Sequence, residues 1–255
     1  MATKDGFIGV FDSGVGGLSV LRQLRRLMPQ ERYLYFGDCA NAPYGSKTTQ
    51  QVRDLTMAAA DMLVKRGCKA LVIACNTATA AAIHLLRQRY PDLIVVGIEP
   101  AVKMASDSGV SRIGIMATPV TLREEKLAQL VERFPQLQLQ PIEAPALVSM
   151  IEAGASQQAL QDYLAPILTP WAGKLDAVVL GCTHYPFAAP AISALLGPDT
   201  QLLDGSAGTA RQTKRRLEQA GLLWDGPGGL QIESSNGPAL KNRAMALLQE
   251  EEHAI

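Results

Sequence analysis

The chain has 255 residues, of which 47% are hydrophobic and 19% charged, as expected of a globular protein with a sizeable core. Lysine plus arginine and aspartate plus glutamate number 24 each, so there is no basic excess of the kind that binds nucleic acid or an anionic membrane surface. With three histidines and no C-x-x-C pair, the sequence also lacks a recognisable zinc motif, and we expect no metal.

The sequence favours a cytoplasmic protein. Its first residues, MATKDGFIGVFDSG, carry charges at Lys4 and Asp5 and lack an apolar core of signal-peptide length. The longest uncharged apolar stretch, residues 70–83, is interrupted by Asn76 and several threonines, which is not the pattern of a membrane span. In the cytoplasm we expect the four cysteines to be free thiols: Cys39, Cys68, Cys75 and Cys182.

Short apolar runs alternate with amphipathic stretches along the chain, which predicts an α/β fold with mostly parallel sheets flanked by helices. The predicted strands are Phe7–Phe11, Tyr33–Phe36, Ala70–Ala74, Leu93–Ile98, Ile113–Met116, Ala177–Leu180 and Gln201–Leu203. Helices are predicted over Val52–Leu63, with Gly67 as the C-cap, over about Val120–Phe134 and over about Gln157–Leu168.

A weak internal repeat indicates two related domains. Ile8–Ser13 resembles Ile113–Thr118, and Ala70–Thr77 resembles Ala177–His184, in the same order and at nearly equal spacing. We expect the boundary between the two domains near Gly97–Ala101 and the end of the second near Asp204.

Polar residues directly follow four predicted strands, where open parallel sheets bind ligands. They are Asp12-Ser13, Asp38, Cys75-Asn76-Thr77 and Cys182-Thr183-His184. If the two domains face each other, Cys75 and Cys182 lie on opposite walls of an interdomain cleft. One thiol can then take a proton from one face of a carbon while the other returns a proton to the opposite face, which inverts a stereocentre.

The cysteines also have a plainer interpretation, because free cysteines are commonly small buried hydrophobic residues. Cys39 and Cys68 lack polar neighbours of this kind and are expected to be such residues. His184, two residues after Cys182, can stabilise a thiolate or relay its proton. A Cys-x-His metal half-site is the competing interpretation, but no second pair of ligands is evident.

Asp12 is the candidate carboxylate beside Cys75; its plainer interpretation is the N-cap of a helix that begins near Gly14, and the two roles are compatible. The segment Gly14–Ser19 follows a strand, and Asp38 ends the next strand, a pattern that dinucleotide-binding proteins share. However, Ser19 occupies the third glycine position and no lysine follows the glycines. We therefore expect this loop to offer backbone N–H groups to a small carboxylate. A nucleotide-dependent oxidoreductase and a non-catalytic amino-acid sensor are the alternatives.

Five segments, spread over most of the chain, resemble the bacterial glutamate racemases of the aspartate/glutamate racemase family. They are GVFDSGVGGLSV (9–20), GDCANAPYG (37–45), VIACNTATA (72–80), GIEPAVKMA (97–105) and LGCTHYP (180–186). The resemblance implies a cofactor-independent glutamate racemase that supplies D-glutamate for peptidoglycan synthesis. A related aspartate racemase or broad amino-acid racemase is the alternative.

The same resemblance implies roles for individual residues. Cys75 and Cys182 resemble the catalytic acid/base pair, with Asp12 and His184 as their helpers. Glu152 resembles an acidic residue near the family's cleft, and an exposed helix-end carboxylate is the other interpretation. The residues implied to hold the substrate are Asp12, Ser13, Tyr44, Gly45, Asn76, Thr77, Thr183 and His184.

The resemblance further implies a homodimer whose subunits each have two similar domains. The first comprises residues 1–98 with returning C-terminal helices in residues 208–255, and the second residues 99–207. Position 39 departs from the family pattern, because it holds cysteine where threonine is expected. Some members carry an N-terminal extension tied to activation by a cell-wall precursor. Since few residues precede the first predicted strand here, we expect no such activation.

Overall fold

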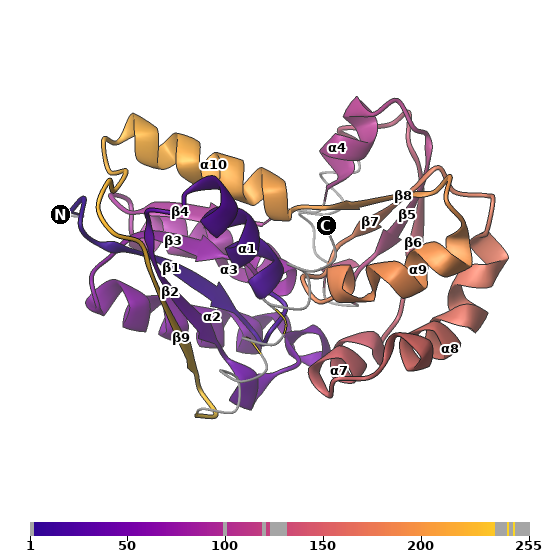
Figure 1. The fold of residues 1–255 in the computed structure, drawn as a ribbon, viewed down its shortest axis with the longest axis horizontal. Helices are drawn as coiled ribbons and strands as arrows, with labels where there is room; N and C mark the ends of the chain where they lie inside the picture. Colours follow the sequence, from indigo (N-terminus) through magenta and orange to yellow (C-terminus); the bar gives the residue numbers. More distant parts are fainter. Residues whose placement is uncertain are drawn as a thin grey trace. The chain divides into compact units, whose positions relative to one another are not determined.

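The computed structural model describes residues 3–98, 101–118, 121–122 and 132–237, together with Ala244 and Leu247. The chain divides into two compact units (Figure 1). Unit 1 comprises Met1–Ile98 and Ser206–Ile255, and unit 2 comprises Glu99–Gly205. The helix predicted over about Val120–Phe134 lies largely outside the described residues.

Unit 1 contains a five-stranded parallel sheet in the order β4-β3-β1-β2-β9. Its strands are β1 (Phe7–Asp12), β2 (Arg32–Gly37), β3 (Cys68–Ile73), β4 (Ile94–Gly97) and β9 (Gly229–Ser234). The sequence predicted the first four, within one or two residues at each end, and missed β9.

The helices of unit 1 pack in two pairs, α1 against α10 and α2 against α3 (Figure 1). Those described over their full length are α1 (Leu18–Leu27), α2 (Thr49–Lys65), α3 (Asn76–Arg89) and α10 (Ser206–Gln219), with short 3-10 helices η1 (Cys39–Asn41) and η2 (Tyr44–Ser46). Alternate strand residues such as Phe11, Leu34 and Ile73 form one core with α2 and α3. The residues between them are buried too, so both faces of the sheet are covered.

Local signals explain the ends of α2. A capping box at its start pairs Thr48 with the third helical residue, Gln51: each side chain bonds to the other residue's backbone N–H. The C-cap is Arg66, not Gly67 as predicted. Gly67 is the next residue, and its φ of +87° lies in the left-handed region that glycine adopts without strain.

A buried ion pair joins distant segments of unit 1 at the amino ends of its strands. Lys69 Nζ lies 2.7 Å from Glu31 Oε2 and donates hydrogen bonds to the carbonyl oxygens of Lys4 and Leu222, each at 2.8 Å. Glu31 Oε1 accepts the backbone N–H of Trp224 at 2.9 Å. Burial lowers the pKa of Lys69, and the Glu31 carboxylate partly offsets that effect.

Unit 2 contains a four-stranded parallel sheet in the order β6-β5-β7-β8. The strands are β5 (Arg112–Met116), β6 (Gln138–Ile142), β7 (Ala177–Leu180) and β8 (Gln201–Asp204), of which only β6 was not predicted. The described helices are α4 (Val102–Asp107), α7 (Leu147–Glu152), α8 (Gln157–Leu168) and α9 (Ala189–Leu196), with 3-10 helices η3 (Thr169–Trp171) and η4 (Tyr185–Ala188). Helix α8 has the bounds predicted for it.

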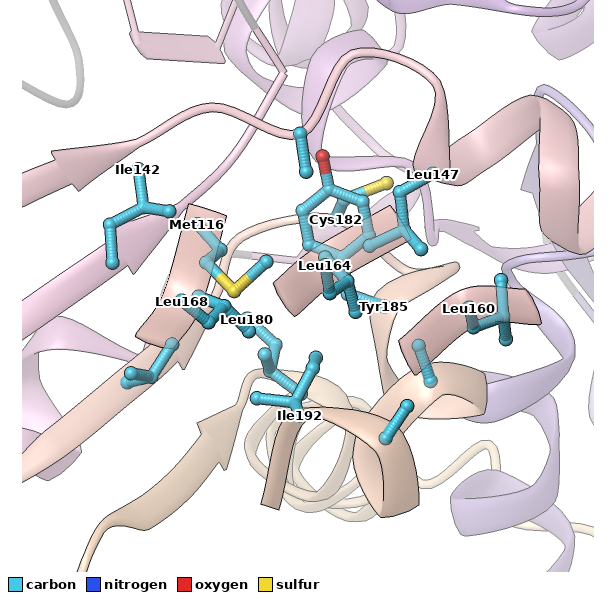
Figure 2. Close-up of a cluster of buried hydrophobic side chains, with 14 of the residues drawn as sticks. Met116, Ile142, Leu147, Leu160, Leu164, Leu168, Leu180, Cys182, Tyr185 and Ile192 are labelled. Carbon is cyan, nitrogen blue, oxygen red and sulfur yellow. The ribbon is translucent and has the colours of Figure 1, made fainter. Parts of the chain in front are cut away.

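The core of unit 2 lies on both faces of its sheet. On one face Met116 and Leu180 pack with Leu164 of α8 and Ile192 of α9 (Figure 2). On the other face α4 covers the alternate strand residues, such as Ile115 and Val179. Because the interior strands β5 and β7 are covered on two sides, their sequences are mostly continuous apolar runs.

The two sheets share one topology, which confirms the predicted α/β fold with two similar parallel sheets. In chain order, the second strand pairs with the first, the first with the third, and the third with the fourth; unit 1 adds β9 beside β2. In an open parallel sheet, a crevice forms at the carboxyl ends of two neighbouring strands when the chain continues from one strand toward one edge of the sheet and from the other strand toward the opposite edge. That place is between β1 and β3 in unit 1 and between β5 and β7 in unit 2.

Among the residues that the structure describes, none belongs to a helix long and apolar enough to cross a membrane.

Candidate active site

Cys75 lies between β3 and α3, at the crevice position of unit 1. It is the N-cap of α3, and its Sγ accepts the backbone N–H of Ala78 at 3.5 Å. The residue is only 5% exposed. A sulfur at the start of a helix is near the positive end of the helix dipole, which favours the thiolate form.

The loop after β1 brings two more predicted residues to the same place. Ser13 Oγ lies 3.7 Å from Cys75 Sγ, within hydrogen-bonding range for sulfur. The carboxylate of Asp12 is fully buried, and its Oδ1 accepts the backbone N–H of Gly14 at 2.8 Å. Asp12 therefore closes a tight turn over its own loop.

The interpretation of Asp12 as a helix N-cap is wrong. Helix α1 begins at Leu18 and not near Gly14, and its N-cap is Gly17, without a side-chain capping bond. A Cβ added to Gly17 would lie 2.6 Å from the Cβ of Asp12 and 2.9 Å from the Cβ of Ala74. The glycine therefore lets the start of α1 approach the strand ends that carry the candidate site.

Tyr44 and Gly45 lie in η2, in a segment that a buried carboxylate holds in place. The Tyr44 hydroxyl donates to Asp38 Oδ2 at 2.7 Å, and Asn41 Nδ2 lies 3.0 and 3.1 Å from the two carboxylate oxygens. Burial raises the pKa of Tyr44 far above its ordinary value, and the Asp38 bond and the nearby Asp38, Cys75 and Asp12 charges raise it further. Tyr44 is therefore a neutral donor committed to Asp38.

Asn76 and Thr77 form the first turn of α3, directly after Cys75, and both are buried. Neither Asn76 Oδ1 nor Asn76 Nδ2 has a hydrogen-bond partner among the described residues. Buried amides are nearly always paired, because an unpaired one loses its bonds to water without replacement. The Asn76 side chain can therefore donate to and accept from a ligand beside Cys75.

Cys182 follows β7 at the equivalent position of unit 2, and a chain of polar groups leads away from it. Its Sγ lies 3.7 Å from His184 Nδ1, and His184 Nε2 lies 2.6 Å from Glu152 Oε1. His184 and Thr183 are buried, whereas the Glu152 side chain is 24% exposed. Glu152 is the last residue of α7, so it is a helix-end carboxylate, but it is half-buried and not exposed as in the plainer interpretation.

Cys182 also belongs to the hydrophobic core of unit 2. Figure 2 shows it beside the ring of Tyr185 and the side chain of Leu147, in the core that α7, α8 and α9 share. Burial raises the pKa of Tyr185 well above its ordinary value, and charge on Cys182 raises it further. Tyr185 therefore stays neutral, and the sulfur lies in a setting with little water.

The structure thus gathers the predicted residues into two groups, one in each unit. One hydroxyl at a strand end was missed. Thr118 follows β5, and its Oγ1 lies 3.0 Å from Thr121 Oγ1. Thr118 corresponds to Ser13 in the internal repeat, so the repeat contained the signal that could have identified it.

The family model described as Asp/Glu/Hydantoin racemase matches residues 8–213, a span that contains both groups. The chain belongs to this racemase family. The family predicted from the sequence motifs is therefore confirmed.

The most similar members of the racemase family include glutamate racemases. This chain is 44% identical over 243 residues to that of Clostridium botulinum, covering 93% of this chain and 94% of that protein. The solved structure of the Thermus thermophilus enzyme in complex with beta-chloro-D-alanine has a TM-score of 0.84 and 38% identity, covering 96% of this chain and 94% of that one. The Escherichia coli enzyme, solved with L-glutamate and the activator UDP-MurNAc-ala, has a TM-score of 0.84 and 30% identity with the same coverage.

Cys75 and Cys182 both belong to hydrophobic cores, so the plainer interpretation of a buried cysteine fits their surroundings too. Cys68 is in the core of unit 1, where burial raises the pKa of its thiol to about 12, so it stays protonated at neutral pH. Cys39 was expected to be a small buried residue. It lies in η1 and is only half-buried. In the described ranges no three or more His, Cys, Asp or Glu side chains are grouped so that they could hold a metal ion.

Proposed function

We propose that this racemase interconverts L- and D-glutamate without a cofactor, with Cys75 and Cys182 as its two acid/base residues. The observation that carries the proposal is the matched position of the two thiols. Each follows the third strand of a sheet with the same strand order, and each has a polar side chain 3.7 Å from its sulfur. Two equivalent thiols suit a reaction in which L and D substrates exchange roles.

In the proposed reaction one cysteine is a thiolate and the other a thiol. The thiolate takes the α-proton of the amino acid, whose electron pair stays on the carbon and spreads into the α-carboxylate. The thiol on the opposite face then gives its proton to that carbon, and the enantiomer is complete. The two sulfurs end in exchanged protonation states, so the reverse reaction uses them in the opposite order. That both sulfurs reach one substrate molecule stays a prediction.

The α-proton of an amino acid is far less acidic than a thiol, whose ordinary pKa is about 8.5. The reaction therefore needs hydrogen-bond donors around the substrate carboxylate, in a place with little water. The unpartnered Asn76 amide beside Cys75 supports such a role. Thr77, Thr183 and the backbone amides that follow Asp12 are the further proposed ligands.

The proposal gives the two thiols different helpers. Asp12 and Ser13 serve Cys75, and the sulfur–hydroxyl distance of 3.7 Å lets Ser13 donate to the thiolate. His184 serves Cys182 and is in turn oriented by Glu152, whose negative charge stabilises the protonated imidazole. A protonated His184 can donate toward the Cys182 thiolate and so keep it ready as a base.

The cellular part of the proposal is the supply of D-glutamate for peptidoglycan by a cytoplasmic homodimer. Its support is the resemblance to bacterial glutamate racemases and the 44% identity to the Clostridium botulinum enzyme.

A circular-dichroism assay tests the activity. Protein freed of small molecules is given L-glutamate or D-glutamate, with L-aspartate in parallel and no pyridoxal phosphate or nucleotide. We expect the signal of each glutamate enantiomer to decay to zero and that of aspartate to stay. Decay only after pyridoxal phosphate or a nicotinamide nucleotide is added, faster decay with aspartate, or binding without turnover would each contradict the proposal.

A further inference from the structure

Two tyrosines of β2 hold opposite ends of the segment that follows β1. Tyr33 and Tyr35 are two residues apart on one strand, so their side chains point to the same face of the sheet. The Tyr35 hydroxyl donates to the carbonyl oxygen of Gly14 at 2.7 Å, in the loop before α1. The Tyr33 hydroxyl lies 3.0 and 2.9 Å from the carbonyl oxygens of Leu24 and Met28, at the end of α1.

We propose that Tyr35 is a positioning residue for proton transfer at Cys75, which it influences through the loop that carries Asp12 and Ser13. This inference rests on the proposed racemase function, in which Cys75 is one of the two acid/base groups. Tyr35 itself is fully buried on β2 and acts through the Gly14 carbonyl oxygen.

Gly14 is the point at which the loop is fixed from two sides. Its backbone N–H donates to Asp12 Oδ1 at 2.8 Å, and its carbonyl oxygen accepts from the Tyr35 hydroxyl. The residue between Asp12 and Gly14 is Ser13, whose Oγ lies 3.7 Å from Cys75 Sγ. A shift of the Gly14 peptide therefore moves the hydroxyl that faces the sulfur.

Removing the Tyr35 hydroxyl leaves a buried carbonyl oxygen without this donor. A buried group in that state gains free energy by moving toward another donor or toward water. The ring of Tyr35 would stay in the core, because phenylalanine has the same shape without the oxygen. Tyr35→Phe thus disturbs the loop while preserving the packing of β2.

Tyr33→Phe is the matched control. It removes the same atom from a buried tyrosine on the same strand, but the carbonyl oxygens it leaves are those of Leu24 and Met28. These lie at the far end of α1 from Asp12 and Ser13. Any effect common to the two variants is therefore an effect on folding.

The first measurement is the steady-state kinetics of both variants with L- and D-glutamate. A small displacement of a reacting group lowers turnover strongly, so we expect Tyr35→Phe to lower kcat by about tenfold or more and to change KM much less. We expect Tyr33→Phe to keep kcat within about twofold of the parent, with a similar shift of the urea unfolding midpoint in both variants. Equal losses of kcat in the two variants would overturn the proposal.

The second measurement does not depend on activity. Iodoacetamide modification of each cysteine is followed by mass spectrometry across pH, which gives a titration midpoint for every thiol. In Tyr35→Phe we expect the midpoint of Cys75 to rise, because the Ser13 donor no longer supports the thiolate, and that of Cys182 to stay. An unchanged Cys75 midpoint, or the same rise in Tyr33→Phe, would overturn the role of Tyr35. If the parent protein does not racemise glutamate, the proposed function fails while this measurement still decides whether Tyr35 controls Cys75.

Discussion

Glu152 and Cys182 contact the same imidazole ring at its two different nitrogens. Glu152 Oε1 lies 2.6 Å from His184 Nε2, and Cys182 Sγ lies 3.7 Å from His184 Nδ1. The carboxylate thus fixes the orientation of the ring, while the sulfur faces the other ring nitrogen. The His184 side chain therefore lies between the Cys182 thiol and the Glu152 carboxylate and contacts both.

Glu152→Gln tests this connection. Glutamine has the shape of glutamate but lacks the negative charge that stabilises the protonated His184. We expect kcat to fall by about tenfold to 100-fold, less than for a group that transfers the proton itself because Glu152 acts through His184, with little loss of stability. Steady-state kinetics with both enantiomers and a urea unfolding curve measure the two effects. Asp162→Asn, an exposed carboxylate of α8 in the same unit, is the control and should leave kcat unchanged.

The isotope content of the product in D₂O distinguishes two bases from one. With a separate base for each face, the product carries solvent deuterium from the first turnover, while the substrate recovered early carries almost none. Proton NMR of both pools at low conversion measures this. Deuterium that appears in the recovered substrate as fast as in the product would show that a single base serves both faces.

The cysteine variants assign one face to each sulfur. We expect Cys75→Ser and Cys182→Ser each to abolish racemisation, because a serine hydroxyl is too weak an acid to supply a resting base. The thiol that remains can still exchange the α-proton of one enantiomer with D₂O, and the two variants should select opposite enantiomers. Exchange of the same enantiomer by both variants would reject the assignment. Cys68→Ser, at a buried thiol whose pKa is raised to about 12, should keep the activity.

Asp12→Asn separates charge from structure beside Cys75. Asparagine can accept the Gly14 N–H as the carboxylate does, so we expect the free energy of unfolding to change by less than about 1 kcal/mol. The loss of the negative charge beside Cys75 should nevertheless lower turnover. Thermal unfolding and steady-state kinetics measure the two effects. Unchanged turnover would limit Asp12 to holding the turn.

Lys69→Met tests the buried ion pair of unit 1. The substitution leaves the Glu31 carboxylate buried without its counter-charge, so we expect a loss of about 3–5 kcal/mol in the free energy of unfolding. The double variant Lys69→Met with Glu31→Gln removes both charges and should recover part of that loss. Urea unfolding followed by tryptophan fluorescence measures it, because the backbone of Trp224 bonds to Glu31. Equal losses in the single and double variants would show that the charge of Glu31 is not the cause.

The sequence predicted every interior strand and two of the four edge strands, β4 and β8, and it missed the other two. Strands β1, β3 and β7 lie in the interior of their sheets, so their residues are almost all apolar. The two missed strands, β6 and β9, are edge strands with polar residues and partial exposure. Strand β6 even contains Pro141, which an edge tolerates because one side of the strand has no partner. Their apolar pattern is too weak to predict a strand.

The sequence predicted the site residues that directly follow strands. It did not predict the contacts that arise when distant elements pack together. The sequence singled out Cys75 and Cys182 because the repeat places each after an apolar run. The contact between Glu152 and His184 joins residues 32 positions apart, and it exists because α7 packs beside η4. Likewise, no local pattern indicates that Tyr35 bonds to Gly14, since the bond depends on the pairing of β2 with β1.

The discontinuity of unit 1 has a consequence for synthesis on the ribosome. Lys69 and Glu31 leave the ribosome early, but the backbone groups that complete their buried network belong to Leu222 and Trp224, 153 residues after Lys69 and 193 after Glu31. All of unit 2 is translated in between. When synthesis has reached the end of unit 2, Lys69 and Glu31 therefore still lack the backbone groups of Leu222 and Trp224 as partners. Unit 1 reaches its final packing only when residues 206–255 are made, and until then this end of its sheet is the part that a chaperone or a protease would meet.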